Sequence, residues 1–353
     1  MGWTVLVAAF GSLVLAGWLY QAAGAARDRR RFTPPGALAP VGAHRLHYRC
    51  DGSGTPAVIL EAGIAASSLT WSRVQPAIAR DTRVCSYDRA GLAWSEAASS
   101  TRTMDALVRE LRLLFTSANI PPPYVLVAHS FGALVIRAFA RAHPAEVAGL
   151  VFVDPLHPEE WCDPSPNQEH MLRGGIFLSR VGAVLARLGV VRLCLALLSG
   201  GAPGAPRQLS RMLGRRAAAL LEHLVDEVQK LPPEVLPSVQ AHWSNPKAFR
   251  GMWQHLAAMP SCSANLVRAV DAFADIPVVV LSAGNRAPRW LAADAALAAS
   301  SSRGRHIVSA KSGHWIHLDD PDLVVQAIRA VICVSVTRIR TARPPCTDPN
   351  DRT

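Results

Sequence analysis

The chain has 353 residues, half of them hydrophobic, and carries a formal net charge of +11 at pH 7. Its basic residues are dispersed, without zinc-finger spacing, an RNA-binding aromatic motif or a long Lys/Arg tract, which argues against nucleic acid as a partner and favours an anionic lipid surface. The seven cysteines form no C-x-x-C pair, so we expect neither a disulfide framework nor a metal site, with Cys85, Cys194 and Cys333 as buried thiols.

The N-terminal segment "MGWTVLVAAFGSLVLAGWLYQAAGAA" has no charged side chain and is long enough to cross a bilayer as a helix. Trp3, Trp18 and Tyr20 lie near its two ends, and an Arg-rich stretch, "RDRRR", follows it. We predict an uncleaved transmembrane anchor over residues 1–26, which contacts the bilayer through residues 3–20. The positive-inside rule then puts the rest of the chain in the cytoplasm. The alternative is a signal peptide cleaved near "AGAA", which would give a secreted or periplasmic protein.

Residues 27–44 are expected to form a basic Pro/Gly linker. After them, short apolar runs alternate with helical patterns, which predicts a mostly parallel α/β sheet with helices on both faces. The predicted strands are residues 45–48, 57–60, 84–87, 124–127, 150–153, 278–281 and 306–309. The predicted helices are residues 71–80, 104–118, 131–143 and 321–331.

This alternation is interrupted once, between residues 155 and 274, where the pattern is helical and lacks a good strand. We expect a helical lid there, with a core formed by residues 45–154 and 275–332. Residues 333–353 are basic and contain prolines, and we expect them to be disordered.

Ser130 stands at a sharp joint between a predicted strand and a predicted helix, in "VLVAHSFGALV". A nucleophile elbow, G-x-S-x-G, needs small residues two positions before and after the serine. Gly132 meets this requirement, and Ala128 replaces the first glycine. The alternative is a serine that caps the helix beginning at Phe131. Adjacent to Ser130, His129 must point elsewhere, and we expect it to support the site without reacting.

A serine nucleophile needs a base. The best candidate is His314, in "SAKSGHWIHLDDPDLV", a loop that follows the last predicted strand. His317 is expected to pack or cap near the start of the final helix.

These segments, with "LEAGIAASSLTW", "VCSYDRAGLAWSE" and "LVFVDPLHPE", resemble the α/β-hydrolase fold superfamily, in its serine-nucleophile, lid-bearing branch. The resemblance covers residues 45–331. It implies an oxyanion hole made by the backbone N–H groups of Phe131 and Ile64. Glu61 is expected to be structural, paired with loop backbone or with an arginine. Asp88 and Arg89 are expected to pair and hold their loop.

The acid of the triad is open to two interpretations. Many members of the superfamily place it after the strand at residues 278–281, but Asn285 lies there and the first acidic residue is Asp294. Asp154, at the end of the preceding strand, can reach the same edge of the sheet. We favour Asp154 and keep Asp294 as the alternative acid; Asp154 could instead cap the turn before Pro155.

The expected function is a membrane-anchored serine hydrolase that cleaves an ester or related acyl bond of a small apolar substrate, without a metal or organic cofactor. Amide hydrolysis, carbon–carbon bond hydrolysis and acyl transfer would use the same groups, and a non-catalytic binding protein could keep the fold. In the lid, Arg173, Arg180 and Arg187 recur every seven residues beside apolar positions. This pattern fits either a helix lying on a membrane or a solvated stripe.

Overall fold

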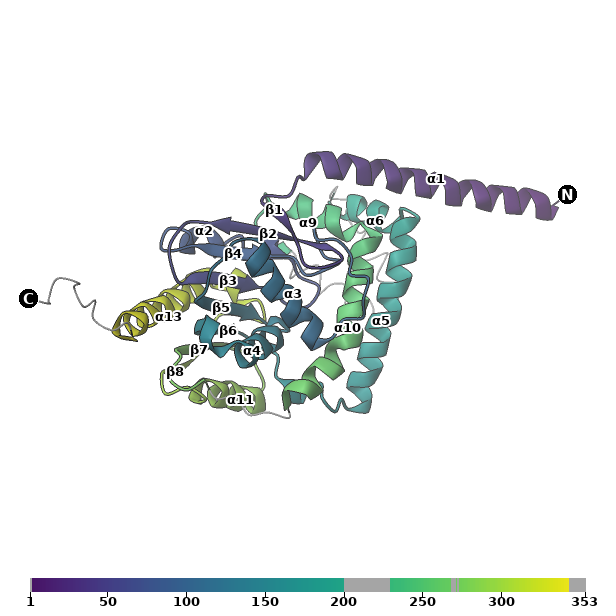
Figure 1. The fold of residues 1–353 in the computed structure, drawn as a ribbon. Helices are drawn as coiled ribbons and strands as arrows, with labels where there is room; N and C mark the ends of the chain where they lie inside the picture. The colour runs from purple at the N-terminus through teal and green to yellow at the C-terminus, as the bar shows by residue number, and fades with distance from the viewer. Residues whose placement is uncertain (1, 200–228, 268–270, 272, 343–353) are drawn as a thin grey trace, which may run out of the picture.

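The computed structural model describes residues 2–199, 229–267, 271 and 273–342. Within them, strands form one sheet in the order β1-β2-β4-β3-β5-β6-β7-β8 (Figure 1). Strand β2 runs antiparallel to β1 and β4, and the neighbours from β4 to β8 are parallel. The bounds are β1 Ala37–Pro40, β2 Arg45–Asp51, β3 Ala57–Glu61, β4 Val84–Tyr87, β5 Tyr124–His129, β6 Val147–Val153, β7 Val278–Ala283 and β8 Gly304–Ser309. The expected mostly parallel α/β sheet is confirmed.

Helices cover both faces of this sheet. On one face, α3 and α4 share an apolar core with β5, β6 and the long helix α10. On the other, α2 and α13 pack against the valines of the same strands. Because the central strands are buried on both sides, their sequences are continuous apolar runs without alternation. The helices of the core are α2 Gln75–Ile78, α3 Met104–Ser117, α4 Gly132–Ala142, α11 Pro288–Ala299, α12 Ile316–Asp319 and α13 Pro321–Ala342, with short 3-10 turns at Ser68–Trp71, Pro144–Glu146 and Pro158–Glu160.

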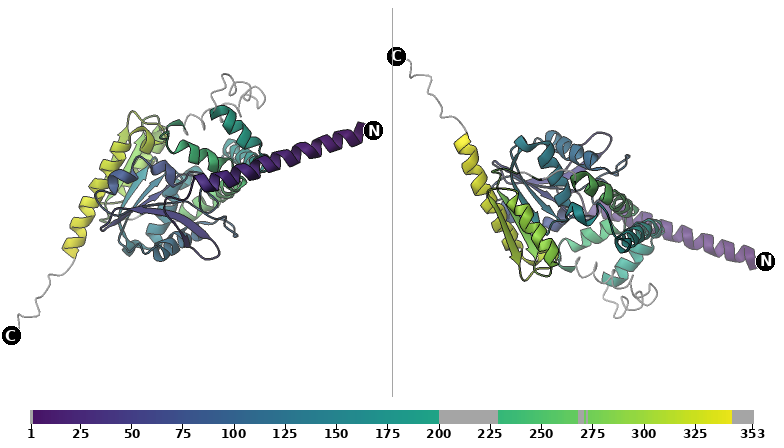
Figure 2. Two further views of the ribbon diagram at one scale, coloured as in Figure 1. Left: turned by 90° about the horizontal axis from the view of Figure 1, so that it is seen from above. Right: turned by 90° about the horizontal axis from the view of Figure 1, so that it is seen from below.

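Between β6 and β7 the described residues form helices and irregular segments. These helices are α5 Pro166–Arg187, α6 Val190–Ser199, α9 Leu236–Trp243 and α10 Pro246–Val267. They lie along one side of the sheet, and α1, Gly2–Arg31, crosses near them and projects past the domain (Figures 1 and 2). Residues 200–228 of the expected lid lie outside the described residues.

The N-terminal boundaries differ from the expectation. Helix α1 continues through the arginines to Arg31, and β1 occupies part of the expected linker. The arginines favour helix, and the first proline after them is Pro34, so nothing ends the helix at Ala26. Strand β1 has one buried apolar side chain in its middle and is held by pairing with β2, a contact that its own short sequence does not reveal.

The expected C-terminal end of the core, residue 332, is too early. Helix α13 runs to Ala342, so residues 333–342, which were expected to be disordered, are helical. The extension packs on the core: Ser335 is buried and donates to the carbonyl of Ala148 at 2.9 Å, and Arg338 pairs with Asp275. These tertiary contacts outweigh the low helix propensity of Val336 and Thr337. Residues 343–353 lie outside the described residues.

The cysteine expectation was wrong, because none of the three residues named is a buried thiol. Cys85 forms a disulfide with Cys50, directly opposite it on the neighbouring antiparallel strand. Cys333 is exposed, and Cys194 is half-buried. The two bonded residues lie 35 positions apart, so only the strand register brings them together.

Candidate active site

Ser130 occupies a strained turn between β5 and α4. Its φ is +52°, a left-handed conformation that costs a non-glycine residue energy and lifts its side chain out of the sheet. Gly132 is required two positions later, since a Cβ atom there would lie 2.8 Å from the carbonyl oxygen of Ala62. The side chain of Ser130 does not cap α4. Its Oγ is directed at His314 instead.

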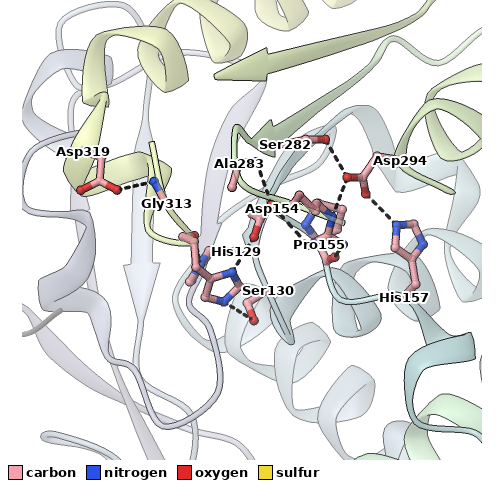
Figure 3. Close-up of polar contacts among 12 residues, drawn as sticks. His129, Ser130, Asp154, Pro155, His157, Ser282, Ala283, Asp294, Gly313 and Asp319 are labelled. Atoms are coloured by element: carbon pink, nitrogen blue, oxygen red, sulfur yellow. Dashed lines mark hydrogen bonds and ion pairs between the residues drawn. The ribbon is translucent and has the colours of Figure 1, made fainter. Parts of the chain in front are cut away.

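Three side chains form a continuous chain of hydrogen bonds at the carboxyl edge of the sheet (Figure 3). The Oγ of Ser130 lies 3.0 Å from Nε2 of His314, and Nδ1 of His314 lies 2.6 Å from Oδ2 of Asp154. With the proton on Nδ1, His314 donates to the carboxylate and accepts from the serine hydroxyl. Asp154 thus meets the geometric requirement for the acid, and it does not cap the turn at Pro155.

The carboxylate of Asp154 is fixed from two further directions. Its Oδ1 accepts the backbone N–H of Ala283 at 2.9 Å, from the end of β7. Arg286 brings Nη1 to 3.3 Å of the same oxygen. Asp154 is 3% exposed, and these contacts leave Oδ2 free to orient His314. Neither Ala283 nor Arg286 was expected at the site; a basic residue in the loop where the superfamily often places its acid was the available signal.

The alternative acid, Asp294, lies in a neighbouring network and does not touch His314. It is fully buried and accepts hydrogen bonds from Ser282 at 2.6 Å and from His157 at 2.7 Å. Its Oδ2 also lies 2.8 Å from Nε of Arg286. Figure 3 shows Asp294 among Ser282 and His157, apart from Ser130. Arg286 therefore connects the two acid positions, and Asp154 holds the one beside the histidine.

Two further histidines support the loop that carries His314. His129 directs its Nε2 to the backbone carbonyl of His314 at 2.9 Å. His317 is completely buried and stacks near Trp71, so it packs as expected. Burial lowers the pKa of His129 well below its usual value, and burial, followed by the nearby His314, lowers the pKa of His317 to about 3. Both imidazoles are neutral around pH 7. Immediately before His314, the N–H of Gly313 donates to Asp319 at 2.9 Å.

The expected oxyanion donors lie next to the nucleophile. Phe131 follows Ser130, and a Cβ atom on Gly63, the residue before Ile64, would lie 3.5 Å from the Cβ of Ser130. Among the described residues, the N–H groups of Phe131 and Ile64 have no hydrogen-bond acceptor. Two unpaired N–H groups beside a serine hydroxyl are what a developing oxyanion requires.

Arg89 holds the loop that precedes Ile64 in place through hydrogen bonds. Its guanidinium donates to the carbonyls of Ala62 and Gly63 and to the carboxylate of Glu61, and its Cζ lies 5.3 Å from the ring centroid of Phe131. Glu61 therefore pairs with an arginine, as expected, and also accepts a hydrogen bond from Tyr87. Burial raises the pKa of Glu61 to about 7 against the opposing effect of Arg89.

The expected pairing of Asp88 with Arg89 was wrong. Asp88 instead accepts from Nδ1 of His47 at 2.8 Å and from the N–H of Ser68 at 2.7 Å. The two neighbours therefore hold different loops. Within the described ranges, no group of three His, Cys, Asp or Glu side chains is arranged to hold a metal ion.

Comparison with known proteins agrees with this fold. Residues 56–174 match the family model described as alpha/beta hydrolase fold. The chain is 36% identical over 112 residues to the uncharacterized protein YqjL of Bacillus subtilis (strain 168), a match that covers 32% of this chain and 44% of YqjL. The chain spans less than half the length of the curated relatives it matches.

Two solved structures resemble nearly the whole molecule. A thermophilic esterase from Thermogutta terrifontis has a TM-score of 0.59 at 20% identity, covering 85% of this chain and 98% of the esterase. The epoxide hydrolase CorEH has a TM-score of 0.61 at 19% identity, covering 84% of this chain and 98% of CorEH. At these identities the likeness establishes the fold alone. The family model, matched over residues 56–174, identifies this fold as the α/β-hydrolase fold.

Proposed function

We propose that this protein is a serine hydrolase that cleaves an ester or related acyl bond. The observation that carries the proposal is the hydrogen-bonded chain from Ser130 through His314 to Asp154. The epoxide hydrolase and the esterase share the fold, so the fold does not choose between their reactions. The residue at the elbow favours the esterase, because epoxide-opening chemistry on this fold would use an aspartate as nucleophile.

In the proposed mechanism, Nε2 of His314 takes the proton of Ser130 as Oγ attacks the substrate carbonyl carbon. The resulting oxyanion accepts hydrogen bonds from the N–H groups of Phe131 and Ile64, and Asp154 stabilises the imidazolium. The bond to the alcohol breaks as His314 returns the proton to the leaving oxygen. Water, deprotonated by His314, then attacks the acyl-enzyme and releases the carboxylic acid and free Ser130.

The substrate is proposed to be a small apolar ester, because the chain between β6 and β7 is rich in apolar side chains and is proposed to act as a lid. The same groups could serve amide hydrolysis, carbon–carbon bond hydrolysis or acyl transfer. A non-catalytic binding protein would keep the fold without needing the aligned triad.

A fluorophosphonate probe tests the proposal, because it reacts only with an activated serine. We expect labelling of the wild-type chain at Ser130, and neither labelling nor ester hydrolysis by Ser130→Ala, whose smaller side chain fits the elbow. Hydrolysis of a series of acyl esters of increasing chain length would then define the substrate. Wild-type turnover in Ser130→Ala, or no labelling of well-folded wild-type protein, would reject the mechanism.

We also propose that α1 anchors the protein in a membrane through residues 3–20. In the described part of the chain, α1 is the helix long and apolar enough to cross a bilayer. Its apolar side chains are largely exposed, for example Trp3 at 84% and Leu13 at 72%, which water alone would not favour. The full chain should stay with membranes after a high-salt wash and keep its N-terminal residues. A mature N-terminus near Ala25 in mass spectrometry would identify a cleaved signal instead.

Two features bear on the side of the membrane that holds the catalytic domain. The arginines at the end of α1 favour the cytoplasm by the positive-inside rule. The Cys50–Cys85 bond favours an oxidising compartment, periplasmic or extracellular. We favour the exported side, since the charge rule expresses a bias whereas a persistent disulfide needs oxidising conditions.

A further inference from the structure

Helix α5 packs against the domain through small residues and exposes large apolar side chains on another part of its surface. Its inner face is buried: Ser179, Gly182 and Ala186 are covered, and Gly182 lies close to the ring of Phe249 from α10. Its outer face is exposed to solvent, with Phe177 at 64% and Val184 at 59%. We define this outer face as Met171, Phe177, Leu178, Val181, Val184 and Leu185, all of them exposed. A helix that exposes so many large apolar side chains is poorly suited to water alone.

A row of arginines borders this outer face. Arg173, Arg180 and Arg187 recur every seven residues along α5 and are all exposed. Arg180 lies over the ring of Trp253, and Arg173 pairs with Glu169 one turn away. This arrangement fits a lipid interface. The apolar side chains would contact acyl chains, and the guanidinium groups would contact lipid phosphates.

Helix α1 docks on the same layer by specific contacts. A Cβ atom on Gly17 would lie 2.3 Å from the carbonyl oxygen of Leu188, so the backbones touch at the junction of α5 and α6. One and three turns further on, Gln21 donates to the carbonyl of Ser244 at 3.0 Å and Asp28 pairs with Arg192 at 2.6 Å. The position of α1 relative to α5 is therefore fixed by close packing and by charge.

The length of α1 before its contact with the domain, compared with the thickness of a bilayer, places α5 at the level of the membrane surface. Residues 2–16, which precede the contact at Gly17, make about 22 Å of helix, whereas a bilayer core is about 30 Å thick. A spanning α1 must therefore stay in the membrane as far as its contact with the α5–α6 junction. In Figures 1 and 2 the N-terminal half of α1 projects past the domain, and in Figure 1 α5 runs crosswise to it at the side from which it projects.

We infer that the outer face of α5 is a second membrane-binding surface, seated in the headgroup region of an anionic bilayer beside α1. This inference rests on the anchoring proposed for α1. It goes beyond anchoring because it fixes the orientation of the domain: the chain between β6 and β7 faces the lipid, and the opposite edge of the sheet, at β8, faces away.

The test uses the full chain, reconstituted in vesicles of phosphatidylcholine with a minor fraction of phosphatidylglycerol. An environment-sensitive fluorescent amino acid replaces Val184 in one variant and Val308 in a matched control. Val308 is an exposed valine, 46% accessible, on β8. Nitroxide-labelled lipid is the quencher, and flotation of the vesicles checks that each variant is anchored.

We expect blue-shifted emission at position 184 and quenching severalfold stronger than at position 308. Equal quenching at both positions in protein that floats would overturn the inference while leaving the anchor intact. Failure to float would overturn both. A blue shift at 184 without quenching, together with a dimer in detergent, would also overturn it and assign the outer face to a second copy of the chain. Fluorophosphonate labelling of Ser130 in the same samples reports on the hydrolase separately.

Discussion

At the scale of single residues, we predict that removing the charge of Asp154 lowers turnover much more than removing the charge of Asp294. Asp154→Asn keeps the size of the side chain but removes the charge that orients His314 and stabilises its imidazolium. The corresponding change in a serine protease lowers kcat about 10⁴-fold. We expect a loss of roughly 100-fold or more here. Asp294→Asn, which touches Arg286 and His157 but not His314, should lower turnover less than about tenfold. Steady-state kinetics with one soluble ester measures both, and a reversed order would restore Asp294 as the acid.

Arg89 is the next residue to test, because its guanidinium contacts both sides of the oxyanion hole. Removing the charge would leave the buried Glu61 without its counter-ion and with Tyr87 as the donor that remains, and breaking a buried ion pair costs about 3–5 kcal/mol. Arg89→Lys keeps the charge but cannot reach both loop carbonyls together. We expect kcat to fall roughly 10- to 100-fold with a smaller change in KM, as when an oxyanion donor is misplaced. An unchanged kcat in a folded variant would make Arg89 purely structural.

The sequence predicted these residues unequally well, for a physical reason. Ser130 and Asp154 directly follow β5 and β6, and His314 lies in the loop after β8, so local patterns place all three at one edge of the sheet. Arg286 and Arg89 contact groups that follow other strands, so their partners depend on how the strands are arranged in the sheet. Glu61 was expected to pair with loop backbone or with an arginine, and neither the choice nor the arginine could be deduced without the fold.

At the scale of elements, two neutral histidines lie in contact where the end of β5 packs against α12. His129 and His317 have ring centroids 4.5 Å apart, and the pKa values of both are lowered by burial. Below pH about 6.5 the unfolded chain binds protons that these folded imidazoles do not, so the free energy of unfolding falls as the pH falls. For His317, this loss extends down to its folded pKa of about 3.

We therefore predict that His317→Phe, which keeps a buried ring beside Trp71, reduces the slope of stability against pH by about one proton. That corresponds to about 1.4 kcal/mol per pH unit between pH 6 and 4. Urea denaturation at several pH values measures the slope. His170→Gln, at an exposed position of α5, is the control. An unchanged slope in His317→Phe would mean that His317 titrates in the fold.

The elements themselves were predicted well where they are central and less well at the edges. The sequence pattern predicted strands β3 to β7 because strands buried on both faces consist mainly of apolar residues. Strand β1 and the last turns of α13 were missed, since each is stabilised by contacts with distant segments. The disulfide was missed for the same reason: Cys50 and Cys85 meet through strand register.

At the scale of the whole molecule, the anchoring proposed for α1 leaves two possible sides of the membrane for the domain, and the oxidation state of the cysteines tests which one holds it. If the domain is exported, the bond between Cys50 and Cys85 should form in the cell. We predict that, in cells lysed directly into denaturant with a maleimide polymer, two of the seven cysteines resist labelling until a reductant is added. The double variant Cys50→Ala/Cys85→Ala should show no reductant-dependent step. Full labelling of the wild-type chain without reductant would place the domain in the cytoplasm, as the arginines of α1 suggest, with these two residues present as thiols.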